Sequence, residues 1–272
     1  MSNMKYLNLG CGTHYSLAKE WTNIDFSSSG PGVIAHNLLK GIPFNDNSFD
    51  LVYHSHVLEH FSKEDGENLI AECYRVLKPG GILRVVIPDL EMIARNYLKY
   101  FDEGVKNPND ELIRANYEWM KLEMYDQTVR NYGGGDLAKY LFKKNIINES
   151  FVFERIGEEG KAIRNNYLES EKKGKHKARV GIKQKIKTLF LKLMGIDIKA
   201  YYIGKFRLGG EIHQWMYDRY SLSKLLELKG GKETIVQSAF TSYLKAWADY
   251  GIDGKNNSVR KPDSLFVESI KK

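Results

Sequence analysis

Short apolar runs and amphipathic segments alternate along the first ninety residues of the chain. Five runs have the length of buried strands: residues 6–9, 21–26, 32–37, 51–54 and 82–87. Residues 13–20 are typical of a loop followed by a short helix. A longer helical pattern fills residues 63–77, with Ser62 and Asp65 as a capping box and Lys78-Pro79-Gly80-Gly81 as its stop. Strands that alternate with helices predict a parallel sheet with right-handed crossovers.

Two glycines mark the first turn of this sheet. Gly10 and Gly12 follow the first strand, where glycine lets the backbone turn tightly and lets a ligand approach it. Parallel sheets bind ligands at the carboxyl ends of their strands. Those ends carry Gly10, Gly12, Asp25, Asn37, His56 and Asp89. Asp25 can accept hydrogen bonds from ribose hydroxyls or can cap the turn at 27–30, and the sequence leaves both roles open.

Four segments resemble, in order and spacing, the motifs of class I methyltransferases that use S-adenosylmethionine. They are Leu-Asn-Leu-Gly-Cys-Gly at 7–12, Asn-Ile-Asp-Phe at 23–26, the segment 42–60, and Arg-Val-Leu-Lys-Pro-Gly-Gly-Ile-Leu at 75–83. Together they span residues 5–90. Two later segments, 211–226 and 260–268, are similar to the type 11 methyltransferase-domain subgroup, which is often linked to surface polysaccharide synthesis.

This resemblance implies an α/β fold: a Rossmann-like, seven-stranded, mostly parallel sheet with helices on both faces and one antiparallel strand. Residues 233–240 and 264–270 are expected to form the antiparallel pair that closes the sheet. Residues 1–90 and 210–272 would form this core. Residues 91–209 do not fit the compact family pattern and predict a mostly helical insertion, placed as a lid and substrate region over the strand ends.

The resemblance also implies S-adenosylmethionine as cofactor, with S-adenosylhomocysteine as product. The residues at the family's cofactor positions are Asn8, Gly10, Cys11, Gly12, Asp25, Phe26, Asn37, Leu38, Ser55 and His56. The family often carries acids where this chain has Asn8 and Asn37, and an asparagine can still accept hydrogen bonds there. A nicotinamide-dependent oxidoreductase is disfavoured, because the third glycine of its motif would fall at Tyr15. A cofactor-binding protein without turnover stays open.

A hydroxyl acceptor, such as that of a sugar, a glycan or another small molecule, benefits from a general base that removes its proton. The candidate catalytic residues near the strand ends are His56, Asp89 and His213. A second hypothesis is metal-assisted transfer, because His56, Glu59 and His60 would share one face of a helix at i, i+3 and i+4. Glu59 and His60 can equally anchor the loop by hydrogen bonds. Trp215 and Tyr217, flanked by 201–202, predict either a sugar-binding wall or packing of the lid.

Charge separates one segment from the rest of the chain. The 272 residues carry a net charge of +7, whereas residues 161–194 hold eleven Lys/Arg and two Asp/Glu, which is +9, so the remainder is 7 − 9 = −2. Residues 182–194 predict a basic amphipathic helix with lysines at 183, 185, 187 and 192. Two interpretations stay open: a helix packed on the lid with a solvated lysine face, or contact of residues 175–194 with an anionic membrane or glycan. Nucleic acid is not expected.

The composition of the chain indicates the class of protein and its cellular compartment. The hydrophobic fraction of 42% is ordinary for a globular protein, and no apolar run approaches the roughly 20 residues that span a bilayer. The two cysteines, and a first strand that begins too early for a signal peptide, predict a cytoplasmic protein, peripheral to the inner membrane face if the basic segment binds lipid. The sequence does not predict the oligomeric state.

Overall fold

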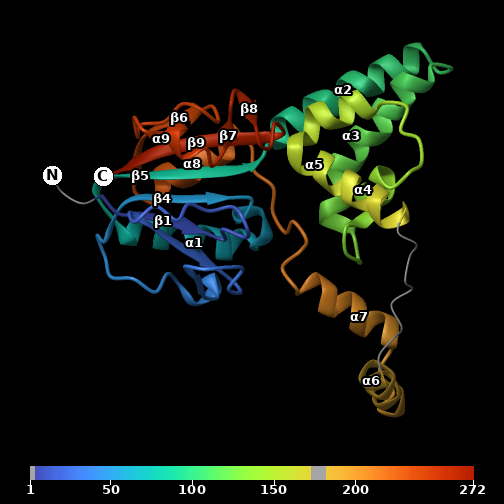
Figure 1. The fold of residues 1–272 in the computed structure, drawn as a ribbon, viewed down its shortest axis with the longest axis horizontal. Helices are drawn as coiled ribbons and strands as arrows, with labels where there is room; N and C mark the ends of the chain where they lie inside the picture. The colour runs from blue at the N-terminus through green and yellow to red at the C-terminus, as the bar shows by residue number, and fades with distance from the viewer. Residues whose placement is uncertain (1–3, 173–181) are drawn as a thin grey trace.

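The computed structural model describes residues 4–172 and 182–272, and the side chains of these except 172 and 182–185. A seven-stranded sheet with the order β3-β2-β1-β4-β5-β9-β6 forms its centre (Figure 1). The strands are β1 (Tyr6–Leu9), β2 (Trp21–Asp25), β3 (Val33–Ala35), β4 (Phe49–Ser55), β5 (Leu77–Pro88), β6 (Gly231–Gln237) and β9 (Ser264–Lys271). Strands β1 to β5 pair in parallel, and β9 runs antiparallel to both β5 and β6. The predicted mostly parallel sheet with one antiparallel strand is therefore confirmed.

Two apolar layers cover the sheet, because successive side chains of a strand point to opposite faces. Helices α1 (Lys63–Val76) and α8 (Arg219–Leu228) cover one face, where Leu7, Val52 and Leu226 belong to a fully buried cluster. The other face packs Tyr6, Tyr53 and Phe266 against Trp247 of the short helix α9 (Trp247–Tyr250). The small hairpin of β7 (Gly254–Lys255) and β8 (Ser258–Val259) follows α9.

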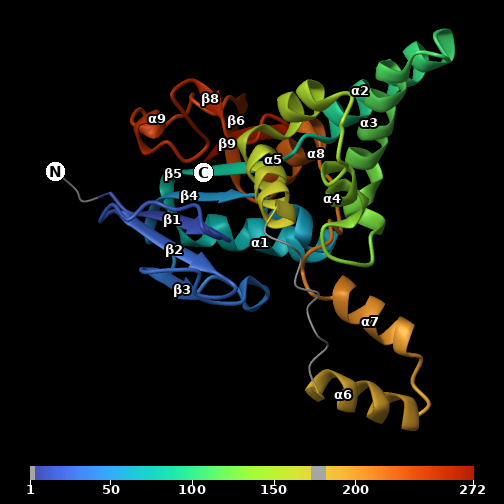
Figure 2. The same cartoon turned by 45° about the vertical axis from the view of Figure 1, so that its right-hand side comes forward.

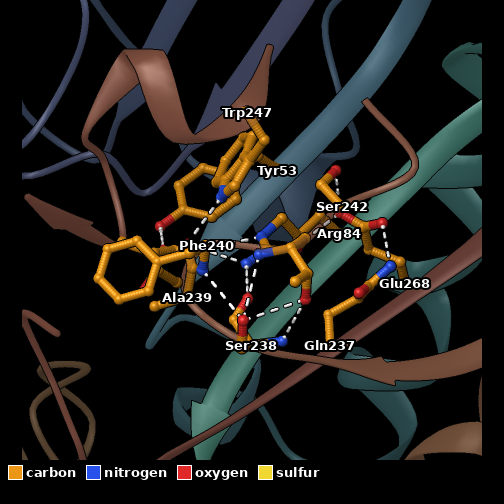
Figure 3. Close-up of polar contacts among 12 residues, drawn as sticks. Tyr53, Arg84, Gln237, Ser238, Ala239, Phe240, Ser242, Trp247 and Glu268 are labelled. Carbon is orange, nitrogen blue, oxygen red and sulfur yellow. Dashed lines mark hydrogen bonds and ion pairs between the residues drawn. The ribbon is translucent and has the colours of Figure 1, made fainter. Parts of the chain in front are cut away.

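A buried ion cluster fixes the segment around α9 to the sheet (Figure 3). Arg84 of β5 is fully buried and donates to Asp253 and Glu268, each at 2.8 Å. It also donates to the carbonyls of Thr241 and Ser238, at 2.9 and 2.8 Å. A buried charge is tolerated when it is paired and its donors are used, as they are here. The cluster thus joins β5, β9 and the irregular segment between β6 and β9.

Every element described between β5 and residue 209 is a helix. The six helices are α2 (Leu90–Lys106), α3 (Glu111–Val129), α4 (Gly135–Leu141), α5 (Glu149–Lys172), α6 (Ile182–Leu193) and α7 (Ile198–Arg207). Helices α2 to α5 form a bundle with its own core around Trp119 and Met120, and α2 continues directly from the carboxyl end of β5. In both views α6 and α7 extend away from this bundle (Figures 1 and 2). That the helices act as a lid stays a prediction.

Two local expectations are wrong. Residues 13–20 contain no helix, because Asn23 donates to the carbonyl of Ser16 at 2.9 Å and the Ser16 hydroxyl accepts from the backbone of Ala18. These side-chain bonds compete with a helix of so few residues. The pair Asn107-Pro108 in the sequence is typical of a helix start, but α3 begins at Glu111. The Asp110 carboxylate accepts two backbone N–H groups and forms a stronger start.

Candidate functional site

The glycine turn after β1 has a backbone that only glycine adopts readily. Gly10 has φ +61°, and a Cβ placed there would lie 2.4 Å from a methyl group of Val57. This close approach, and not ligand contact alone, requires glycine at position 10. Gly12 faces open space, with no atom within 4 Å of a Cβ built there, and its N–H donates to Asp25 at 2.5 Å. Asp25 therefore holds the turn open at the end of β2.

A cavity of about 240 Å³ lies over this turn. It brings together six of the predicted cofactor residues: Asn8, Gly10, Cys11, Gly12, Ser55 and His56. Asp25 reaches it through Gly12. Phe26, Asn37 and Leu38 lie outside the cavity, since the Phe26 side chain is exposed and Asn37 caps the 3₁₀ turn η1 (Leu38–Lys40). Their part in cofactor binding stays a prediction.

Three of the lining residues that the sequence did not predict come from elements distant in sequence from the glycine turn. Glu159 comes from α5, and Arg260 and Lys261 come from the loop before β9. Lys261 pairs with Glu159 at 2.9 Å, and Arg260 donates to the Ser55 hydroxyl at 3.4 Å. The resemblance of residues 260–268 to a methyltransferase subgroup was the available signal. No local pattern indicates that α5 docks against this loop.

A second cavity of about 530 Å³ lies between the strand ends and the helical bundle. His56, Glu159 and Lys261 line both cavities, so the two adjoin at the end of β4. The polar and charged residues of the second cavity are His56, His60, Gln127, Arg130, Glu159, Glu211, His213, Lys261 and Asp263. Trp119 and Phe142 contribute its aromatic surface. A cavity of this size and polarity suits a small polar molecule.

His56 occupies the junction in a fixed orientation. Its backbone has φ +55°, and its ring Nε2 lies 2.8 Å from the Ser264 hydroxyl. Its Nδ1 lies 3.3 Å from a carboxylate oxygen of Glu59. The negative charge of Glu59 favours the tautomer with the proton on Nδ1, although no hydrogen bond forms between them, and Nε2 then accepts from Ser264. A histidine whose tautomer is fixed by a carboxylate is arranged as a general base.

Glu59 lies among three histidines. Burial by itself raises the pKa of Glu59, but contact with His56 and the charges of His56, His213 and His60 outweigh it and lower the pKa to about 2. Burial lowers the pKa of His213 to about 3, with the Glu59 charge opposing. At neutral pH the folded protein therefore holds an ionised Glu59 beside a neutral His213.

The geometry changes the predicted metal triplet. Glu59 and His60 lie in a single 3₁₀ turn, η2 (Leu58–His60), and His56 precedes it with a left-handed backbone, so the three residues do not share a helical face. One ligand atom each from Glu59, His60 and His213 lies within 4.8 Å of the others. The structure thus places His213, from the segment after α7, where the sequence hypothesis had His56.

Comparison with known proteins agrees with this arrangement. A family model described as a methyltransferase domain matches residues 7–85, which contain β1 to β4, α1 and most of β5. This segment therefore matches the methyltransferase-domain family. Family and fold imply S-adenosylmethionine as its cofactor. The residues present fit that cofactor, because the open cradle at Gly12 adjoins Asp25 and the polar cavity.

Two curated relatives are similar to part of this chain. A probable S-adenosylmethionine-dependent methyltransferase of Mycolicibacterium smegmatis is 32% identical over 98 residues, which are 30% of this chain and 37% of that protein. The probable methyltransferase ltbC of Aspergillus luteorubrus is 43% identical over 58 residues, 20% of each chain. The chain thus spans less than two fifths of the curated relatives it matches. A solved methyltransferase structure from Thermotoga maritima aligns with 98% of this chain and 82% of its own, at 14% identity and a TM-score of 0.40.

Asp89 is not among the lining residues of either cavity. Its carboxylate caps α2 by accepting from the backbone of Met92 at 3.1 Å, and burial raises its pKa. Asp263, whose carbonyl accepts from the Asp89 backbone, lines the second cavity instead. The geometry therefore favours a structural role for Asp89, whereas Asp263 joins Glu159 and Glu211 as a carboxylate that lines the second cavity.

The predicted aromatic wall does not form at this site. Tyr217 is buried in the core beneath α8, and Trp215 lies at the surface with the Lys63 ammonium 5.4 Å from its ring. Tyr201 and Tyr202 belong to α7. In the described part of the chain, the second cavity is instead lined by Trp119 and Phe142.

Proposed function

We propose that this methyltransferase moves the methyl group of S-adenosylmethionine to a hydroxyl of a sugar, a glycan or another small polar molecule. The observation that carries the proposal is the meeting of two cavities at His56. The glycine-turn cavity would hold the methionine part of the cofactor, and the larger cavity the acceptor. Its hydrogen-bonding side chains suit a polyhydroxylated molecule, and the resemblance of residues 211–226 and 260–268 supports a glycan.

Each side chain near His56 would have a separate role in the reaction. When bound, the cofactor supplies an electrophilic sulfonium methyl group. Asp25 and the Gly12 backbone position it, and the helical bundle forms one side of the acceptor cavity. Glu59 holds the proton on Nδ1 of His56, which leaves the Nε2 lone pair to receive a proton. Ser264 occupies that lone pair at 2.8 Å until an acceptor hydroxyl replaces it.

Cofactor binding is tested by calorimetry with S-adenosylmethionine. Replacement of Asp25 by alanine removes an acceptor and releases the Gly12 backbone, so the affinity should fall by about 1–3 kcal/mol, or roughly 5- to 150-fold. Asp102→Ala, at an exposed position on α2, is the matched control and should bind normally. Normal affinity of Asp25→Ala would contradict the assignment of this cavity.

Turnover is tested with labelled cofactor and a panel of sugars and glycans. His56→Ala should lose roughly 10²–10⁴ in turnover and keep cofactor affinity within about threefold, because a general base acts after binding. His36→Ala, a histidine outside both cavities, should transfer normally. Transfer by His56→Ala at the normal rate would exclude this base. Cofactor binding without transfer to any acceptor would favour a binding protein without turnover.

We also infer that α6 rests on an anionic membrane. Ile186, Leu189, Phe190 and Leu193 share one face of α6, and between 60% and 78% of each is exposed. This contradicts the expectation that the apolar face packs on the lid. Lysines at 183, 185, 187 and 192 supply positive charge beside it, although the side chains of 183 and 185 lie outside the described residues. An apolar face beside lysines matches acidic headgroups over acyl chains.

Within residues 4–172 and 182–272, no helix combines the length and the apolar character that crossing a membrane requires. Contact through α6 would therefore be peripheral. Because the cytoplasmic leaflet carries the anionic lipids, we propose that the protein works at the cytoplasmic face.

A further inference from the structure

Glu59 is an anomaly among the buried charges of the described chain. Only 1% of its side chain is exposed, and neither carboxylate oxygen makes a hydrogen bond within the described residues. The Nδ1 of His56 lies 3.3 Å from one oxygen, at an ion-pair distance, but it does not satisfy the geometry of a hydrogen bond. A buried carboxylate normally accepts several hydrogen bonds or binds a cation, because its desolvation is otherwise costly.

Two imidazoles face the same point. One ligand atom each from Glu59, His60 and His213 lies within 4.8 Å of the other two, and the two rings meet edge to face with centroids 4.9 Å apart. The His60 Nδ1 lies 3.1 Å from the Ile212 carbonyl, to which it can only donate. The lone pair of His60 is therefore on Nε2. A backbone carbonyl that orients a histidine in this way is typical of metal-binding imidazoles.

The backbone holds the three side chains in register although they are far apart in sequence. The Glu59 carbonyl accepts from the backbone of Gln214 at 2.7 Å, and the Gln214 side chain donates to the His60 carbonyl at 2.7 Å. The backbone of His213 donates to Gln127 of α3 at 2.9 Å. The turn after β4, the helical bundle and the segment before α8 are thus joined at this cluster.

We propose that Glu59, His60 and His213 form a binding site for one divalent transition-metal ion of the Zn²⁺ or Mn²⁺ class. Two imidazoles and one carboxylate suit these ions, whereas Mg²⁺ and Ca²⁺ prefer oxygen ligands throughout. Three protein ligands leave a coordination position free. His60 and His213 both line the acceptor cavity, so the free position opens toward the acceptor. Bonds of about 2.0–2.2 Å require the side chains to close by on the order of 1 Å.

The chemical role of the ion rests on the proposed function, whereas the binding site does not. An acceptor hydroxyl coordinated at the free position becomes more acidic. Its proton passes to Nε2 of His56, and its oxygen forms a bond to the methyl carbon. The carbon–sulfur bond breaks at the same time and leaves its electron pair on sulfur. His56 is thereby the base next to the ion and not one of its ligands.

Metal binding is measured directly, without reference to turnover. The full chain is stripped with a chelator and titrated by calorimetry with Zn²⁺, Mn²⁺ and Mg²⁺, and bound metal is counted by mass spectrometry. We expect one Zn²⁺ or Mn²⁺ per chain and much weaker binding of Mg²⁺. Glu59→Gln and His213→Ala should each lower the affinity by about 100-fold or more, since loss of a ligand exceeds the roughly 10- to 100-fold effect of its supporting partners.

Two variants, His56→Ala and His36→Ala, serve as matched histidine controls. Both variants should keep one ion per chain, because neither residue contributes a ligand. His36→Ala should keep near-normal affinity, whereas His56→Ala, whose Nδ1 lies 3.3 Å from Glu59, should lose at most roughly 10- to 100-fold. Circular dichroism shows whether each variant folds. If Glu59→Gln fails to fold, His213→Ala still tests the site. Co²⁺ bound by two imidazoles and a carboxylate gives visible absorption bands. The wild type loaded with Co²⁺ should show these bands, and His213→Ala should lose them.

The inference is overturned if the wild type binds no stoichiometric Zn²⁺ or Mn²⁺, or if His213→Ala binds as tightly as the wild type. If His56→Ala loses the ion and His213→Ala keeps it, the ligands are His56, Glu59 and His60, as the sequence predicted. The proposed set with His213 would then be wrong. Methyl transfer at the normal rate by the metal-free protein would agree with the proposed function but would show that the ion has no part in the reaction. Metal binding without transfer would support the site and contradict the function.

Discussion

At the scale of single residues, His54 is buried near the carboxyl end of β4, with no hydrogen-bond partner among the described residues. Its side chain is fully buried, and neither ring nitrogen makes a hydrogen bond within the described residues. Burial lowers the pKa of His54 to about 4, with the charge of Glu59 opposing. The folded protein therefore holds this ring neutral over a pH range in which the unfolded chain protonates it.

The sign of the pH dependence follows from this difference. Between about pH 6.5 and about pH 4 the unfolded chain binds a proton at His54 that the folded chain does not, so acid lowers the free energy of unfolding. We predict that His54→Leu removes this contribution. Between pH 7 and pH 4 the free energy of unfolding of the wild type should fall by about 3 kcal/mol more than that of the variant. This value corresponds to a pKa difference of roughly 2.5 between the unfolded and folded chain. Urea denaturation at several pH values measures it, and parallel curves for the two proteins would contradict it.

Sequence predicted those site residues whose role depends on local spacing. Gly10, Gly12 and Asp25 follow their strands at family distances, and the structure gathers them at one turn. Asp263 and Glu159 could not be predicted in this way, because each reaches the cavity from an element distant in sequence. His213 was chosen as a base from its position, but its contact with Glu59 and His60 depends on backbone bonds that no local pattern indicates.

At the scale of elements, the kink in α5 decides where that helix meets the core. Gly157 interrupts α5 with φ 60° and ψ −151°, a backbone essentially restricted to glycine. A Cβ there would lie 2.6 Å from Pro262 and 2.7 Å from the carbonyl of Arg260. The kink therefore lets α5 approach the loop before β9 and places Glu159 between the two cavities.

We predict that Gly157→Ala destabilises the protein by roughly 1–3 kcal/mol, the cost of a strained backbone position. It should also weaken cofactor binding, because Glu159 and its partner Lys261 move together. Gly104→Ala is the matched control: Gly104 lies inside α2 with no atom within 4 Å of a built Cβ, so alanine should stabilise by about 0.5–1 kcal/mol. Denaturation curves measure both changes. Equal stability of the two variants would show that the kink is not needed.

The elements that the sequence predicted are those with strong local signals. The capping box at Ser62 and the apolar runs gave α1 and the central strands nearly in place. Residues 13–20 did not become a helix, because side chains of Ser16 and Asn23 bond to the backbone instead. The packing of α2 to α5 could not be predicted from the sequence pattern of each helix. Their shared core at Trp119 depends on contacts between residues that are far apart in the sequence.

At the scale of the whole molecule, charge and exposed apolar surface coincide. Residues 161–194 carry a net charge of +9, and the rest of the chain carries −2. Helix α6 lies in this segment, away from the sheet and the bundle (Figure 2). Its side chains Leu189 and Phe190 are exposed to solvent. An exposed apolar face of this kind is unusual on a protein that contacts no surface. Its position separates it from the two cavities, so its role should be separable from cofactor binding.

The last prediction uses that separation. The wild type should sediment with vesicles that contain acidic phospholipid at low salt, and high salt should weaken the binding because it screens exposed charge. Replacing the lysines at 183, 185 and 187 by glutamine should cost about 1 kcal/mol each, or roughly 100-fold together. The matched control replaces three exposed lysines elsewhere, Lys106, Lys144 and Lys255, and should bind nearly as the wild type does.

A second variant separates the apolar contribution from the charge. Leu189→Gln with Phe190→Gln keeps every lysine, so its residual binding should depend on salt while its affinity falls. Both variants should bind S-adenosylmethionine normally, which shows that the domain is folded. If the wild type fails to sediment with acidic vesicles at low salt, or binds neutral vesicles equally well, the anionic membrane is excluded as the partner of α6. Its exposed apolar face would then require a protein partner, and a second copy of this chain could be tested by sedimentation velocity.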